Sequence, residues 1–138
     1  MKWYADYVGI PFRSLGRTRK GCDCYGLLQI VFKEHYNLTL PDVIGYKDAM
    51  NTDQTSHIIE EYTPLLAGEK EVEPKEGMVV VLNGLEGLSS HVGVLISDKL
   101  MLHTTKRFGT IIEDLSIYKN RVKGFYNVNK SYSTNRPI

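Results

Sequence analysis

Residues 23–36 read DCYGLLQIVFKEHY, and this stretch decides the first half of the fold. Asp23 is a favoured N-cap residue, while Asn37 and Pro41 mark the far end of a helix. One side of the predicted helix collects side chains at helical spacing. They are Cys24, Leu27, Leu28, Val31 and His35. The sequence therefore predicts a helix whose core-facing stripe begins at Cys24.

Short strand patterns follow in the second half of the chain. They cover residues 78–82, 91–97, 100–105, 110–113 and 124–128. Turn residues separate the first four, which indicates an antiparallel meander. Weaker helix signals cover residues 2–8 and 55–62. Helices first and strands afterwards predict an α+β fold, in a single domain of residues 1–138.

Composition excludes several classes of function. The 138 residues include 17 basic and 16 acidic ones, a net charge of +1, so we expect no nucleic-acid partner. No apolar run approaches the ~18 residues of a membrane helix, so we expect no membrane partner either. Asp6 lies where a signal peptide would be apolar, and we expect no signal peptide.

Cys24 is the candidate nucleophile. At a helix N-terminus, unpaired N–H groups favour the thiolate, and Arg17 adds positive potential that Asp23 opposes. We expect the balance to favour activation; the alternative is a small buried hydrophobe. Cys22 is too close in sequence to bridge Cys24 without strain. Its role stays open between a buried neighbouring thiol and redox protection of Cys24.

A thiolate nucleophile needs an imidazole base, and the chain has four histidines. His35 lies eleven residues from Cys24, about 16 Å along a helix, and is too far. His57 reads as a solvated residue. His91 and His103 share a sheet face if the loop between their strands is three residues, 97–99, and lie on opposite faces if it is two. The sequence leaves both registers open.

Other sites have weaker support. Thiols one residue apart do not match the spacing of zinc sites, so we expect no metal, and no glycine motif indicates a cofactor. The basic loop at residues 13–20 is either solvated surface or a contact for an anionic polymer.

Four motifs together resemble the NlpC/P60 family of cysteine peptidases. They read GIPFRSLG at 9–16, GCDCYGL at 21–27, LPD at 40–42 and SHVGV at 90–94, with His103 later. The resemblance implies a papain-like α+β fold, with N-terminal helices packed on an antiparallel sheet of about five strands. It also implies amide hydrolysis through an acyl-enzyme, usually at the γ-D-glutamyl to diamino acid bond of cell-wall peptides.

Carried over by position, Cys24 is the nucleophile, His91 the base and His103 the residue that orients it. The spacing of the two histidines then favours the three-residue loop. Asp23 would help to receive the peptide's amine. Three departures from the family pattern affect rate or substrate identity, and one is Gly77-Met78, where Gly-Asp is usual before the first strand. Phe12 stands where the family commonly has a tyrosine hydroxyl, and Tyr25 stands where serine is usual.

An aromatic residue after the cysteine resembles the bacteriophage-tail branch of the family. With Ser90 and Tyr25 as further substrate contacts, the leading hypothesis is a tail-associated endopeptidase, carried on the virion and assembled in the host cytoplasm. Its partners would be peptidoglycan peptides and other tail proteins. One alternative is a structural tail-tip or assembly protein with little turnover. Another is a bacterial amidase, transferase or effector on the same scaffold.

Overall fold

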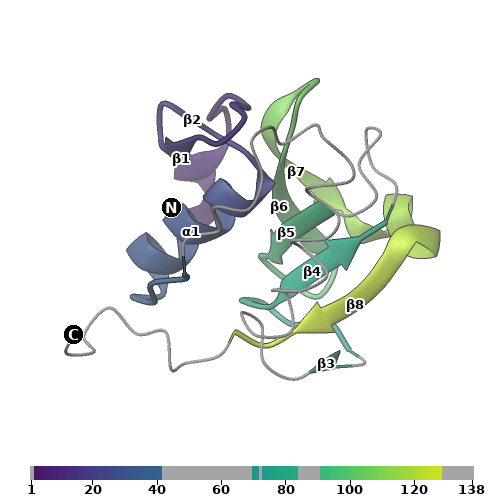
Figure 1. Cartoon of the computed structure of the whole chain (residues 1–138). Helices are drawn as coiled ribbons and strands as arrows, with labels where there is room; N and C mark the ends of the chain where they lie inside the picture. Colours follow the sequence, from purple (N-terminus) through teal and green to yellow (C-terminus); the bar gives the residue numbers. More distant parts are fainter. Residues whose placement is uncertain (1, 42–69, 72, 84–90, 129–138) are drawn as a thin grey trace.

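The computed structural model describes residues 2–41, 70–71, 73–83 and 91–128. Helix α1 lies against an antiparallel sheet of order β3-β8-β4-β5-β6-β7, and a small β1-β2 pair lies near the start of α1 (Figure 1). The elements are η1 (Trp3–Tyr7), β1 (Arg17–Thr18), β2 (Gly21–Cys22), α1 (Cys24–His35), β3 (Lys70–Glu71), β4 (Val79–Leu82), β5 (His91–Leu95), β6 (Leu100–Thr105), β7 (Gly109–Asp114), η2 (Leu115–Arg121) and β8 (Val122–Tyr126). The predicted α+β class is confirmed.

Helix α1 begins and ends where its sequence predicts. The Asp23 carboxylate accepts a hydrogen bond from the Gly26 N–H at 2.8 Å, so one of the unpaired donors of the first turn is satisfied. After the last turn, Asn37 adopts the left-handed conformation with φ 57°. The stripe from Cys24 to Val31 is buried as expected, but His35 is exposed and stacks on Trp3 with ring centroids 3.9 Å apart.

The sheet is buried on both faces. On the α1 side, Val79, Val81, Val92 and Val94 join the helix in one hydrophobic cluster. A second hydrophobic cluster lies on the other side of the sheet, where Leu115 of η2 packs against side chains of β4, β5 and β6 and of the residue before β4. These side chains are Met78, Val80, Leu82, Leu95 and Met101. The second cluster was not foreseen, because η2 carries no helix pattern in the sequence.

Five predicted strands are present, and the two-residue β3 extends the sheet at one edge. The predicted helix at residues 2–8 is a 3-10 helix, η1, and Gly9 follows it with φ +98°. The predicted helix at residues 55–62 lies outside the described residues. Among the described helices, none combines the length and apolar character needed to cross a bilayer.

Asp23 should contribute measurably to stability. Asp23→Ala removes the cap, a hydrogen bond from the Leu15 N–H and the ion pair with Arg17, so we expect a loss of about 1–3 kcal/mol in the free energy of unfolding. Asp23→Asn keeps an oxygen for the cap and should lose less. Urea denaturation followed by circular dichroism measures both. Equal losses in the two variants would contradict a stabilising role for the cap.

Candidate active site

The β5–β6 hairpin has the register that brings two histidines to one face. Val94 pairs with Leu102 and Leu95 with Met101, and the Ile96 N–H donates to the Leu100 carbonyl at 3.0 Å. The connecting loop is therefore the three residues 97–99. The two-residue alternative, which would separate the histidines, is excluded.

His91 and His103 are in direct contact. Nε2 of His91 lies 2.9 Å from Nδ1 of His103, and the rings meet edge to face with centroids 5.1 Å apart. Gly93 follows His91 by two residues on β5 and faces His103 on β6. A Cβ atom at position 93 would come within 3.1 Å of the His103 Cβ, so the glycine leaves room for the rings. Both histidines are buried. The hydrogen bond fixes the relative orientation of the two imidazoles.

Two further residues extend this pair. Nε2 of His103 lies 2.7 Å from Oε1 of Glu113, which also accepts a hydrogen bond from the Tyr118 hydroxyl at 2.7 Å. Sequence reasoning missed both. For Glu113, the length of the loop between β6 and β7 was a usable signal in the sequence. A three-residue loop at 106–108 pairs Met101 with Glu113, and this register makes Glu113 the diagonal neighbour of His103. Tyr118 lies in η2, and the sequence of η2 has no pattern that predicts a helix.

The Cys24 thiol reaches β5 at the strand's first residues. Cys24 is the first residue of α1, and the backbone N–H groups of Val92 and Tyr25 are directed at its sulfur. By strand alternation the His91 ring belongs to the side of the sheet that carries Leu95, whereas α1 covers the other side. Nδ1 of His91 is buried and has no hydrogen-bond partner among the described residues, so the thiol and this nitrogen are not bonded here.

Burial leaves the thiol protonated. It raises the pKa of Cys24 to about 12, with a further contribution from the nearby Asp23 carboxylate. The expectation that the helix N-terminus and Arg17 would favour the thiolate of Cys24 was wrong. The reason is that Cys24 is only 5% exposed and that Arg17 pairs with Asp23. Burial, and then the proximity of His103, also lowers the pKa of His91 well below its usual 6.5.

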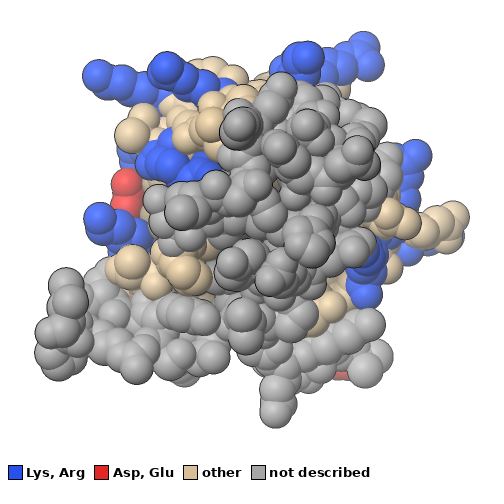
Figure 2. All heavy atoms as spheres, in the orientation of Figure 1, with Lys and Arg blue, Asp and Glu red and all other residues tan. Residues whose placement is uncertain are grey.

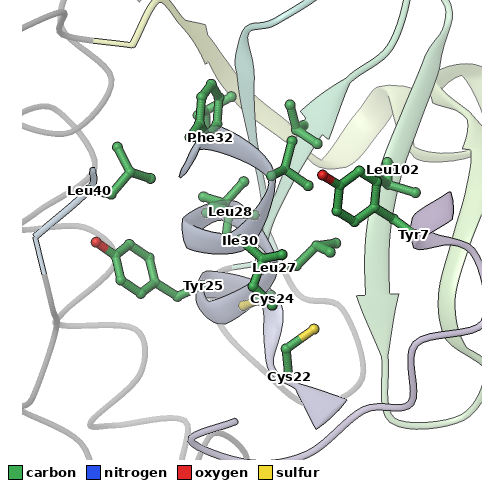
Figure 3. Packing of buried hydrophobic residues seen from close by; sticks show 14 of the residues in the cluster. Tyr7, Cys22, Cys24, Tyr25, Leu27, Leu28, Ile30, Phe32, Leu40 and Leu102 are labelled. Carbon is green, nitrogen blue, oxygen red and sulfur yellow. The ribbon is translucent and has the colours of Figure 1, made fainter. Parts of the chain in front are cut away.

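Cys22 is a second buried free thiol (Figure 3). Burial raises its pKa to about 11, and the neighbouring Asp23 carboxylate contributes in the same direction. Cys22 also forms a parallel bridge with Phe12. Its environment is that of a packed residue between the N-terminal segment and β7.

Asp23 is buried and fully engaged. Its carboxylate contacts the Arg17 guanidinium at 2.8 Å in addition to the N–H groups of Leu15 and Gly26. The predicted contact with a substrate amine therefore stays a prediction, and such an amine would meet a carboxylate that Arg17 already neutralises. The structure assigns Asp23 the cap of α1 and the anchor of the loop before it.

The remaining predicted substrate contacts lie in different places. Tyr25 is buried, points toward Leu40 in Figure 3, and donates a hydrogen bond from its hydroxyl to the Pro41 carbonyl. Phe12 is half-buried against the α1-side core, beside Cys22. Ser90 and His57 lie outside the described residues.

Two of the four cations of the basic loop form ion pairs within the protein. Arg17 pairs with Asp23, and Arg19 pairs with Glu34 at 2.6 Å and lies over the Tyr7 ring. On the face drawn in Figure 2, the visible Lys and Arg side chains lie in separate places around the rim. Within the described ranges, no three His, Cys, Asp or Glu side chains are grouped to hold a metal ion.

Comparison with known proteins identifies the family of this chain. Residues 9–127 match the sequence model of the NlpC/P60 family. The chain belongs to the NlpC/P60 family. The Escherichia coli (strain K12) protein named murein DD-endopeptidase MepS/murein LD-carboxypeptidase is 28% identical over 116 residues, which cover 84% of this chain and 53% of that protein. A probable endopeptidase NlpC homolog of Haemophilus influenzae is 27% identical over 114 residues, covering 81% of this chain and 51% of its own length.

Solved structures agree with the fold. The NlpC/P60 domain of the peptidoglycan hydrolase SagA superposes with a TM-score of 0.59 at 19% identity, covering 90% of this chain and 92% of that one. An NlpC/P60 family protein from Bacillus cereus gives 0.59 at 23% identity, with coverage of 88% and 36%. The chain spans about half the length of the curated relatives that it matches. The papain-like NlpC/P60 fold expected from the motifs is confirmed.

The neutral His91 should make stability depend on pH. Its folded pKa lies below 6.5, so below that pH the unfolded chain binds more protons and the free energy of unfolding falls as the pH drops, by at most about 1.4 kcal/mol per pH unit. Urea denaturation between pH 7.5 and 5 measures this slope. His91→Gln should flatten it, whereas His35→Gln, at the exposed Trp3 stack, should not. Identical slopes in the wild type and His91→Gln would refute a buried neutral His91.

Proposed function

We propose that this chain is a cysteine endopeptidase that hydrolyses amide bonds in peptidoglycan stem peptides, with Cys24 as nucleophile, His91 as base and His103 as orienting residue. The observation that carries the proposal is the buried His91–His103 hydrogen bond, with the Cys24 thiol at the N–H of the adjoining Val92. Family membership supports it, since MepS is named as a murein endopeptidase and SagA as a peptidoglycan hydrolase.

The chemistry follows from the charge states. At rest both groups are neutral, because burial disfavours the thiolate and the imidazolium alike. Because the thiol and Nδ1 of His91 are not hydrogen-bonded in this structure, the step requires the two groups to come into contact. His91 then takes the thiol proton as the sulfur attacks the amide carbonyl, and the resulting imidazolium gives that proton to the leaving amine. Water, activated by the same imidazole, then hydrolyses the thioester. The Cys24 backbone N–H would donate to the oxyanion.

We propose the γ-D-glutamyl to diamino acid bond as the site of cleavage, which is the bond that the family resemblance implies. The relatives' names add the bonds of a DD-endopeptidase and an LD-carboxypeptidase as alternatives. A test should therefore offer monomeric and cross-linked muropeptides together. The masses of the products identify the bond.

We further propose that the chain is a component of a bacteriophage tail, with other tail proteins as partners and the virion as its location. The supporting feature is Tyr25 directly after the nucleophile. Its ring is buried and its hydroxyl is held by the Pro41 carbonyl, so this aromatic residue is built into the start of α1. Mass spectrometry of purified virions tests this part, and absence of the chain from them would refute it.

A second candidate function is a structural tail-tip or assembly protein with the same fold and little turnover. Two observations favour it. Phe12 offers no hydroxyl to an oxyanion or substrate, and burial raises the pKa of the Cys24 thiol to about 12. A structural protein tolerates both features, whereas a fast peptidase does not.

Turnover separates the two candidates. Purified protein incubated with muropeptides should release a new amine, detected by fluorescamine labelling and by product masses. Cys24→Ala should abolish release because it removes the proposed nucleophile, while Cys22→Ala should retain release if folding is intact. No release from the wild type, or equal release from Cys24→Ala, would contradict the peptidase proposal.

Phe12→Tyr should raise activity. Loss of one oxyanion donor typically costs ~10²–10³ in kcat, so a restored hydroxyl should raise kcat by up to about 10²-fold. Phe12→Leu, which adds no hydroxyl, is the matched control. Steady-state kinetics on the same muropeptide measures the effect. An unchanged or lower kcat in the well-folded Phe12→Tyr variant would show that this position does not serve the oxyanion.

A further inference from the structure

Glu113 ends a chain of hydrogen bonds that begins at His91. The chain runs from His91 Nε2 to His103 Nδ1 over 2.9 Å, and from His103 Nε2 to Glu113 Oε1 over 2.7 Å. His103 is fully buried, and the Glu113 side chain is 24% exposed. None of the motifs that identify the family contains Glu113.

The carboxylate determines which nitrogen of each ring carries a proton. An ionised carboxylate only accepts hydrogen bonds, so Nε2 of His103 must be the donor. A neutral imidazole has one N–H, which leaves Nδ1 of His103 as the acceptor. Nε2 of His91 must then donate to it, and Nδ1 of His91 is left with a free lone pair.

The surroundings of Nδ1 of His91 agree with this assignment. Nδ1 of His91 is buried and has no hydrogen-bond partner in the described part of the chain. The opposite proton arrangement, with a charged His103 donating from Nδ1, would place the proton of His91 on this same unpartnered nitrogen. A buried N–H without an acceptor is costly, so the first arrangement is favoured.

We propose that Glu113 is a positioning residue that fixes both histidines as Nε2–H tautomers and so keeps Nδ1 of His91 free to accept a proton. Its use in taking the Cys24 proton rests on the proposed function; the tautomer assignment does not.

Tyr118 supports the carboxylate. Its hydroxyl donates to the same Oε1 at 2.7 Å, and its ring meets that of His103 edge to face at 5.9 Å. One oxygen of Glu113 is thus held from two sides, by β6 and by η2. This contact gives η2 a part in the site, since it orients the group that orients the histidines.

The direct test is imidazole NMR on protein labelled with ¹⁵N-histidine at pH 7. In the wild type, His91 and His103 should both show a protonated Nε2 and an unprotonated Nδ1. Glu113→Met has a similar length and no strong acceptor, so His103 should redistribute between tautomers. Glu113→Gln keeps an acceptor oxygen and should retain the wild-type pattern. Glu73→Gln, an exposed glutamate, is the matched control.

Kinetics on a muropeptide adds the functional readout. Glu113→Met should lower kcat by at least about 10- to 100-fold, the loss typical when a carboxylate that orients a metal-bound imidazole is removed, with KM nearly unchanged, and Glu113→Gln should recover most of the loss. A purely structural role would instead move the two variants in step with their stability.

The outcomes separate this inference from the proposed function. A wild-type protein that cleaves no muropeptide refutes the peptidase, while its imidazole spectra still decide the tautomers. A doubly protonated His103 or a protonated Nδ1 on His91 in the wild type overturns the role of Glu113. Wild-type tautomers in a folded Glu113→Met overturn it equally. Should Glu113→Met fail to fold, the wild-type spectrum decides.

Discussion

The hydrogen bond between His91 and His103 depends on a single structural quantity, the length of the β5–β6 loop. Because side chains alternate along a strand, one residue more or less in that loop would turn one ring to the opposite face. The three-residue connection at 97–99 puts both rings on one face, and Gly93 leaves the space between them. The register of the next hairpin then brings Glu113 beside His103. The candidate site is thus a consequence of two neighbouring loop lengths.

The helix supplies the other half of the site under a competing constraint. Asp23 caps α1 and forms an ion pair with Arg17, and both contacts stabilise the start of the helix. Because the Asp23 carboxylate neutralises the Arg17 guanidinium, Arg17 does little to stabilise a thiolate at Cys24. Packing against the sheet then excludes water from Cys24, so the electrostatic advantage of the helix N-terminus is outweighed by burial. Two neutral groups are cheaper to bury than a thiolate–imidazolium pair. In the proposed mechanism, substrate binding must therefore accompany the proton transfer.

Much of this architecture could be predicted from sequence. The α1 boundaries followed from the Asp23 cap and Asn37, and five strands followed from alternation and turns, because these signals are local. The register of the histidine hairpin could only be narrowed to two choices. The thiol pKa, Glu113 and Tyr118 were missed for different reasons. The thiol pKa depends on how deeply Cys24 is buried, Glu113 depends on the register of the β6–β7 hairpin, and η2, which carries Tyr118, has no periodic pattern.

The central claim is that Cys24 and His91 act as one reactive unit. A stem peptide that carries a chloromethyl ketone in place of the scissile amide tests it directly, with peptide mapping by mass spectrometry. The account predicts one adduct per chain, on Cys24, that forms far more slowly in a folded His91→Ala variant. Modification of Cys22 instead, or a rate that does not respond to His91→Ala, would contradict it.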